Sequence, residues 1–146
     1  MKVPDNALKG WTVLVIDDEP DSAEVASLLL EIYGATVVVA GNGREGLDMI
    51  KKHRPRFVIT DLSMPEMNGW ELTKALKLSD RGISEIPIVA LTAHAMTGDR
   101  SRALQMGFHN YLTKPLVPEA FVNQLLELLV DDIPELKHIF IQDKPQ

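Results

Sequence analysis

Cysteine is absent from this sequence of 146 residues, which excludes disulfide bonds, thiolate metal sites and a cysteine nucleophile. No apolar run approaches the ~18–20 residues that span a bilayer, and the first residues lack the apolar core of a signal peptide. Basic side chains are in the minority, with 15 Lys and Arg against 21 Asp and Glu and a net charge of -6. This balance argues against a nucleic-acid-binding surface. Together these absences predict a soluble cytoplasmic protein.

The residues that are present are typical of one globular domain. The chain is 45% hydrophobic and 25% charged, and its length is sufficient to bury a core. We expect a short leader at residues 1–10, one domain at residues 11–131, and a tail at residues 132–146 that carries a small apolar cluster. Met1 and the distinct tail favour a free-standing protein over a fragment of a larger one.

Five short runs rich in β-branched residues predict strands at residues 12–16, 36–39, 57–60, 86–91 and 110–113. Most of these runs lack polar/apolar alternation, which indicates strands that are covered on both faces, as in a parallel sheet. The last run is the least hydrophobic and is expected at an edge of the sheet.

Amphipathic segments between and after these runs predict helices at residues 22–33, 43–52, 69–78, 97–106 and 117–131. Asn42 is a good N-cap, Gly34 suits a C-terminal stop, and Pro118 suits a helix start. Repeated β-then-α units predict an α/β fold with right-handed crossovers and a parallel sheet.

Polar residues follow four of the five predicted strands. Asp17 and Asp18 follow the first strand, Asp61 follows the third, Thr92 the fourth and Lys114 the fifth. Because the carboxyl ends of parallel strands form the functional rim of an open α/β sheet, these side chains are expected to converge. Each residue alone has an ordinary structural explanation, such as a solvated turn, but their joint placement favours a site.

Three carboxylates in one cleft repel one another, and a divalent cation relieves that repulsion. All-oxygen ligation points to Mg²⁺. Lys114 adds a cation and Thr92 a hydroxyl, so the set suits a phosphoryl group that the Asp61 carboxylate attacks to form an acyl phosphate.

The motifs that carry these residues resemble the receiver domain of two-component response regulators, over about residues 11–130. "VLVIDDEPD" resembles the first strand and acidic pair, and "VITDLSMPEMNGWEL" resembles the phosphoacceptor segment. "IPIVALTAHA" carries the matching hydroxyl residue, and "NYLTKPL" the matching aromatic residue and lysine. The resemblance implies a CheY-like, flavodoxin-like doubly wound fold: a five-stranded parallel sheet of order 2-1-3-4-5 with five helices.

The resemblance also implies roles for residues of the site. Asp61 is expected to receive a phosphoryl group from a sensor histidine kinase or a histidine phosphotransfer protein. Asp18, Asp61 and the backbone carbonyl of Ser63 are expected to ligate Mg²⁺, and Asp17 to act mainly through a metal-bound water. The chain is thereby expected to be a signalling phosphoacceptor that assists its own phosphorylation and dephosphorylation, and not an enzyme acting on a separate substrate.

Further positions are implied to convert phosphorylation into a signal. Lys114 and Thr92 are expected to hold the phosphoryl oxygens, and movement of Thr92 to let Tyr111 swing inward and change the face read by a downstream protein effector. Ser63 and His94 flank the expected path of the hydrolytic water, and our hypothesis is that they tune the lifetime of the phosphoryl group.

Two alternative functions share parts of this pattern. A Mg²⁺-dependent phosphohydrolase of the haloacid dehalogenase kind also forms an aspartyl phosphate, but its D-x-D motif ends the first strand, whereas Asp17 and Asp18 are adjacent here. A flavin binder of flavodoxin type would need a hydroxyl- and Gly-rich phosphate loop after the first strand, where this chain has acidic residues. The sequence leaves open the cognate kinase, the downstream target, the oligomeric state and the role of the apolar tail.

Overall fold

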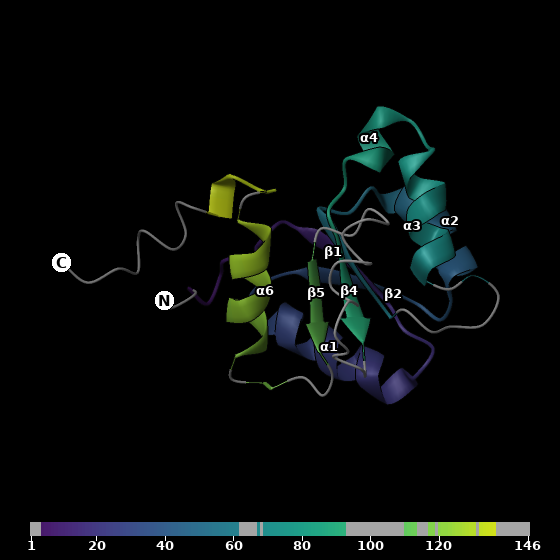
Figure 1. Ribbon diagram of the computed structural model, residues 1–146. Coiled ribbons are helices and arrows are strands. Elements are labelled where there is room, and N and C mark those ends of the chain that lie inside the picture. The colour runs from purple at the N-terminus through teal and green to yellow at the C-terminus, as the bar shows by residue number, and fades with distance from the viewer. Residues whose placement is uncertain are drawn as a thin grey trace.

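The strands form a five-stranded sheet in the order β2-β1-β3-β4-β5, and every neighbouring pair is parallel (Figure 1). The computed structural model describes residues 4–61, 67, 69–92, 110–113, 117–118, 120–130 and 132–136. The observed order confirms the predicted fold class, and it places β5 at an edge, as the weak apolarity of that run indicated.

The strands are β1 (Thr12–Ile16), β2 (Thr36–Ala40), β3 (Phe57–Asp61), β4 (Ile88–Thr92) and β5 (Asn110–Thr113). The strand β4 begins two residues after the start of its apolar run. Pro87 has no N–H to give to a sheet, so regular pairing starts after it. Its carbonyl still accepts the Val58 N–H at 2.9 Å, which guides the chain into the strand.

The helices in the described residues are α1 (Pro20–Ile32), α2 (Gly43–His53), α3 (Gly69–Lys77), α4 (Arg81–Ser84) and α6 (Phe121–Leu129). The helix predicted at residues 97–106 lies outside the described residues. The last helix begins later than the predicted residue 117. Before it, the N–H groups of Ala120 and Phe121 both donate to the Val117 carbonyl, at 3.0 and 2.8 Å, in a turn that leads into α6.

The short helix α4 was not predicted from the sequence. Gly82 lowers the helix propensity of this segment, which therefore resembles a loop. Asp80 nucleates the turn instead: its side-chain Oδ1 accepts the Ile83 N–H at 3.2 Å and its carbonyl accepts the Ser84 N–H at 2.8 Å. A single capping residue thus forms a helical turn where periodicity gives no signal.

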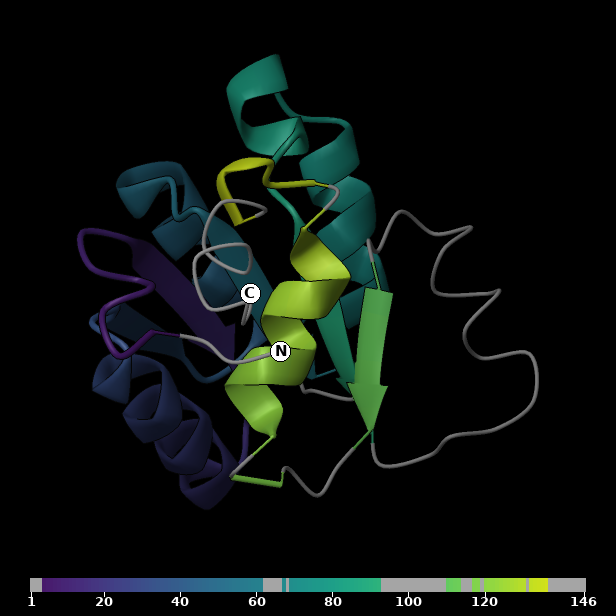
Figure 2. The same cartoon turned by 90° about the vertical axis from the view of Figure 1, so that its left-hand side faces the viewer.

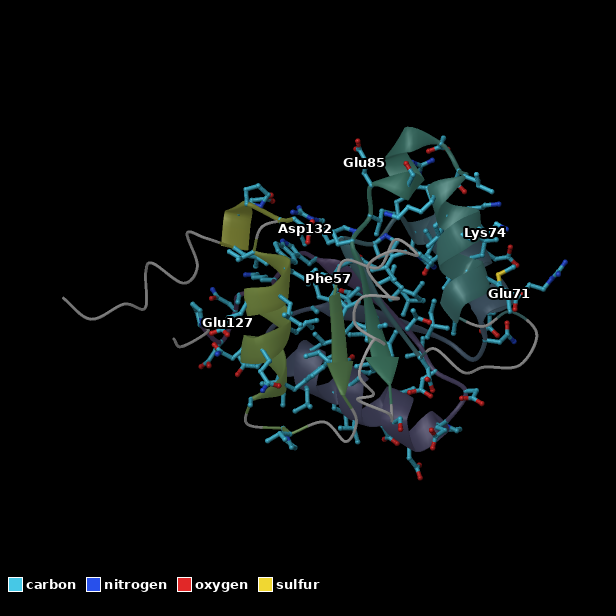
Figure 3. All side chains as sticks on the ribbon, in the orientation of Figure 1. Phe57, Glu71, Lys74, Glu85, Glu127 and Asp132 are labelled. Atoms are coloured by element: carbon cyan, nitrogen blue, oxygen red, sulfur yellow. The ribbon has the colours of Figure 1, made fainter. Side chains whose placement is uncertain are left out.

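Alternate residues of the strands pack on opposite faces of the sheet, which gives two cores. One core lies against α1 and α6, and its strand residues are Val13, Val15, Phe57, Ile59, Val89 and Leu91. The other lies against α2 and α3, and its strand residues are Leu14, Ile16, Ala40, Val58, Ile88 and Ala90. Figure 2 shows α6 covering its face of the sheet, and Figure 3 shows Phe57 inside that layer with Glu127 on the outer side of α6.

Both segments that flank the predicted domain supply core residues. Leu8 and Leu136 are fully buried and Ile133 is 4% exposed, and all three belong to the core under α1 and α6. The division into leader, domain and tail at residues 10 and 131 stays a prediction. Among the described residues, no helix is long and apolar enough to cross a membrane.

Asn42 caps α2, as predicted: its Oδ1 accepts the Glu45 N–H at 2.8 Å. We expect Asn42→Ala to lower the free energy of unfolding by about 0.5–2 kcal/mol, because it leaves that N–H without its acceptor. Asn42→Asp is the matched control, since a carboxylate keeps the acceptor and suits the positive end of the helix. Urea denaturation measures both variants, and equal losses in the two would contradict the capping role.

Candidate functional site

The carboxylates of the sequence motifs meet at the carboxyl ends of β1 and β3. Asp17 directly follows β1, and Asp61 is the last residue of β3. The two strands are adjacent, and their register pairs Ile16 with Thr60. Asp17 and Asp61 each directly follow one residue of this pair. The pairing of the two strands therefore places the two aspartates side by side.

Four carboxylates form one cluster here, which we call the acidic cluster: Asp17, Asp18, Glu19 and Asp61. Each supplies one oxygen, and these oxygens all lie within 4.8 Å of one another. Asp17 is 3% exposed and Asp61 8% exposed, whereas Asp18 and Glu19 are exposed to solvent. Two nearly buried carboxylates so close to other negative charges are costly unless a positive charge or hydrogen-bond donors compensate them.

Backbone groups compensate part of that cost. The Glu19 N–H donates to Asp17 Oδ1 at 3.0 Å. A separate backbone bond, from the Asp17 N–H to the Ala40 carbonyl at 3.1 Å, fixes the backbone at this position. The helix α1 starts at Pro20, immediately after the cluster. The positive end of its dipole therefore lies near the negatively charged cluster.

The cluster is chemically suited to a hard divalent cation. All its side chains offer oxygen, which Mg²⁺ prefers, and two of the four are exposed, which leaves room for the waters that Mg²⁺ retains. Oxygens that share one octahedral Mg²⁺ lie about 3–4.2 Å apart, so the observed spacing needs only a small contraction. The residues present therefore fit the predicted ion.

Backbone register places one further predicted position, Thr92, at the same edge of the sheet. Asp61 pairs with Leu91 on β4, so Thr92 lies one position further along. Thr92 in turn pairs with Thr113, the last residue of β5. The structure describes only the backbone of Thr92 and Tyr111. The predicted site residues Ser63, His94 and Lys114 lie outside the described residues.

Glu19 is the member of the cluster that was not predicted as a ligand. It is the third acidic residue in a row, and its side chain reaches the same region as those of Asp17 and Asp18. The only sequence signal is this adjacency, because spacing along the chain does not show which way a residue at the N-cap of a helix turns. The structure thus enlarges the acidic cluster from three carboxylates to four.

Comparison with known proteins finds response regulators and receiver domains. The sequence model of the response regulator receiver domain matches residues 13–126. The polar-differentiation response regulator DivK of Brucella anthropi is 34% identical over 120 residues, which cover 82% of this chain and 97% of DivK.

Solved structures with the same fold include two informative neighbours. The chemotaxis response regulator CheY4 of Vibrio cholerae aligns with a TM-score of 0.76 at 30% identity, over 82% of this chain and 98% of its own. The receiver domain of the sensor histidine kinase PA1611 from Pseudomonas aeruginosa PAO1 aligns with a TM-score of 0.73 at 28% identity, also over 82% and 98%. In that structure a magnesium ion is coordinated in the active site cleft.

Proposed function

This chain belongs to the response regulator receiver domain family, which acts in phosphorylation-dependent two-component signalling, and we propose that Asp61 is the residue that accepts the phosphoryl group. The observation that carries the proposal is the position of Asp61. It lies 8% exposed at the end of the central strand β3, with three other carboxylates around it.

Asp17 is the other nearly buried carboxylate, and its surroundings favour a supporting role. Its Oδ1 accepts the Glu19 N–H, which shapes the turn between β1 and α1. Asp61 has β1 on one side and β4 on the other, so groups from both neighbouring strands surround it. A nucleophile needs such flanking groups to stabilise the transferring phosphoryl group.

Asp18 and Asp61, with the Ser63 carbonyl, are the proposed direct ligands of Mg²⁺, and Asp17 acts mainly through a metal-bound water. The exposed Glu19 adds a further carboxylate beside them. Bound Mg²⁺ supplies positive charge against the phosphoryl oxygens. The magnesium in the PA1611 receiver domain supports this assignment. Asp17 and Asp18 then hold and orient the cation, and Asp61 keeps one oxygen for the attack.

The donor is a phosphohistidine on a sensor histidine kinase or a histidine phosphotransfer protein. An Asp61 oxygen forms the new bond to phosphorus as the bond from phosphorus to the imidazole nitrogen breaks, and the nitrogen keeps the electron pair. Lys114 and Thr92 hold the phosphoryl oxygens. No proton leaves Asp61, because it attacks as the carboxylate.

Phosphorylation then acts as a switch. The new phosphoryl group adds negative charge and strong hydrogen-bond acceptors beside Thr92. Thr92 moves toward it, and Tyr111 on β5 follows into the space that Thr92 leaves. The face formed by β5 and α6 changes as a result, and a downstream effector protein binds one of its two forms.

Incubation of the full chain with Mg²⁺ and a small acyl phosphate donor tests the proposal. We expect stable incorporation of one phosphoryl group per chain, measured by intact-protein mass spectrometry, and its loss when EDTA removes the metal. Steady turnover of a generic phosphate ester without a stable phosphoprotein would instead support the phosphohydrolase alternative. The matches to receiver domains give that alternative no support.

Ser63 and His94 are proposed to set the lifetime of the phosphoryl group without being required for its formation. We expect Ser63→Asn and His94→Ala each to incorporate phosphoryl to the wild-type level. We also expect at least one of them to change the half-life of the acyl phosphate after the donor is removed, because the resemblance to receiver domains implies that both positions flank the path of the hydrolytic water. Unchanged half-lives in both variants would refute this role.

A further inference from the structure

Residues 132–136 follow α6 and lie across the amino-terminal edge of the sheet, at the opposite end from the acidic cluster (Figures 1 and 2). They lie beyond residue 126, where the match to the receiver domain family ends. The Ile133 N–H donates to the Leu129 carbonyl at 2.8 Å and the Leu136 N–H to the Ile133 carbonyl at 3.0 Å. The segment therefore continues from α6 by a turn of its own.

Two apolar side chains anchor this segment in the core. Leu136 is fully buried and Ile133 is 4% exposed, and both join the core that contains Phe57 and Leu129. Leu8, which precedes the matched region, is buried in the same core, and its N–H donates to the Tyr33 carbonyl at 2.9 Å. Residues outside the family match thus contribute to the core from both ends of the chain.

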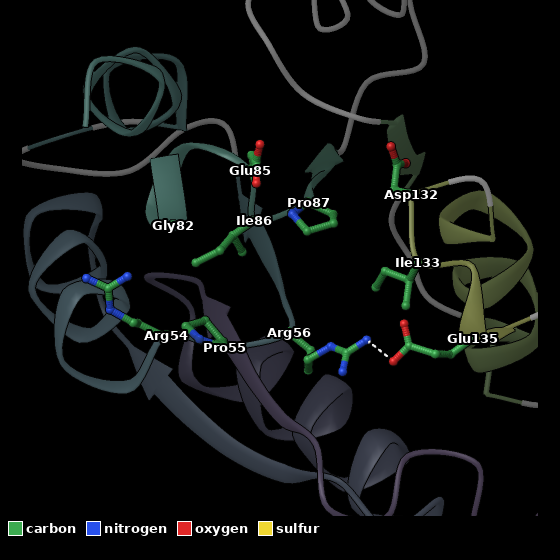
Figure 4. A pocket seen from close by; sticks show the side chains of 10 residues that line it. All are labelled: Arg54, Pro55, Arg56, Gly82, Glu85, Ile86, Pro87, Asp132, Ile133 and Glu135. Atoms are coloured by element: carbon green, nitrogen blue, oxygen red, sulfur yellow. Dashed lines mark hydrogen bonds and ion pairs between the residues drawn. The ribbon is translucent and has the colours of Figure 1, made fainter. Parts of the chain in front are cut away.

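Glu135 adds a polar contact that fixes where the segment lies. Its Oε2 accepts a hydrogen bond from Arg56 Nη2 at 2.6 Å (Figure 4). The guanidinium carbon of Arg56 lies 4.5 Å from the centre of the Trp11 ring, within the range of a cation–π contact. Arg56 therefore connects three separate parts of the chain: the start of β3, the segment before β1, and the segment after α6.

The pKa of the Glu135 carboxyl is lowered chiefly by the hydrogen bond from Arg56, because that bond favours the charged carboxylate. The side chains of Arg56 and Glu135 are nevertheless 40% and 60% exposed, so water screens much of their attraction. Buried Leu136 and Ile133 thus provide most of the binding of the segment, and the ion pair chiefly selects its position.

We infer that residues 132–136 are a strap that closes the amino-terminal edge of the sheet, anchored by Leu136 and Ile133 and positioned by Glu135 on Arg56. The folded unit of this receiver therefore extends through Leu136. The strap also lines part of an open hollow of about 260 Å³, whose lining includes Glu85 and Ile86 (Figure 4). This inference does not depend on the role of Asp61.

Urea denaturation of full-length variants tests the anchor. We expect Leu136→Ala to lower the folding equilibrium constant about 30- to 4,000-fold, the range for buried leucines. Leu78→Ala is the matched control, because Leu78 is 79% exposed, and it should change the constant by no more than about twofold. Equal effects of the two substitutions would overturn the strap.

The ion pair is tested separately, so that the inference stays testable if Leu136→Ala does not fold. A double-mutant cycle of Arg56→Met and Glu135→Gln is expected to show a coupling of about 1.4- to 5-fold in the folding equilibrium constant. Glu24→Gln on the exposed face of α1 is the matched control and should show no coupling to Arg56→Met. Absence of coupling between Arg56 and Glu135 would overturn the positioning role.

Trp11 reports on the strap directly. The chain has two tryptophans, so Trp70→Phe leaves Trp11 as the sole tryptophan, and excitation selective for tryptophan reports on it alone. In that background we expect Glu135→Gln to shift the emission of Trp11, because the Arg56 guanidinium loses its charged partner and changes its position relative to the indole ring. Incorporation of phosphoryl should stay at the level of the background protein. Unchanged emission would contradict the link through Arg56, and a failure of Asp61 to accept phosphoryl would leave this readout unaffected.

Discussion

Asp61→Asn is expected to incorporate no phosphoryl group above background when it is incubated with Mg²⁺ and a small acyl phosphate. An amide has nearly the size of a carboxylate, so the variant fills the same 8% exposed position at the end of β3. It lacks the anionic oxygen that attacks phosphorus, so it has no nucleophile at this position. Intact-protein mass spectrometry measures incorporation, and circular dichroism checks that the variant is folded.

Two control variants separate loss of the nucleophile from loss of the cluster's charge. Asp18→Asn removes one negative charge from the acidic cluster but keeps Asp61, so incorporation should persist and require more Mg²⁺. Asp21→Asn, in the first turn of α1, lies outside the cluster and should match the wild type. Equal incorporation by Asp61→Asn and the wild type would show that the phosphoryl group goes to another residue.

Much of the fold could be predicted because each strand carries a local signal. Strands buried on both faces are continuous apolar runs, and β1 and β5 have the predicted bounds. The predicted bounds were wrong, or an element was missed, where a single residue decides the local structure. Pro87 delays the start of β4 because it has no N–H, and Asp80 forms α4 through hydrogen bonds that leave no periodic pattern.

Burial of the flanking segments could not be predicted from local pattern. Leu8 lies in a segment expected to be a leader, and Leu136 in one expected to be a tail, yet neither is exposed at all. Whether an isolated leucine is buried depends on which distant residues cover it, and here Leu8 and Leu136 share one core with Phe57 and Leu129. The hydrophobic periodicity of a short stretch of sequence does not show which distant residues will cover it.

Convergence of the aspartates was predictable because parallel strands end at one edge, and the register of β1 with β3 places Asp17 beside Asp61. The contribution of Glu19 was not predictable, because it depends on the turn into α1, where the Glu19 N–H folds back onto Asp17. The roles of Thr92, Tyr111 and Lys114 depend on side-chain positions and stay predictions.

Phe57→Ala is expected to cause the largest loss of stability among these single substitutions. Phe57 is fully buried at the start of β3, and its ring meets that of Trp11 edge to face, with 6.4 Å between centroids. Truncation leaves a cavity and removes the aromatic pair, which together should lower the free energy of unfolding by about 3–5 kcal/mol. A domain of this size has about 5–15 kcal/mol in total, so a large fraction of its stability is at stake.

Phe57→Leu is the matched control for this prediction: it keeps an apolar side chain of similar reach and should cost clearly less in urea denaturation. Phe57 and Asp61 lie at opposite ends of one strand, about 13 Å apart at the usual rise per residue. The folded fraction of Phe57→Ala at low temperature should therefore still accept a phosphoryl group, whereas Asp61→Asn should stay folded and accept none. Equal stability of Phe57→Ala and Phe57→Leu would contradict the packing role. Loss of phosphorylation in fully folded Phe57→Ala would show that the two ends of β3 are coupled and not independent.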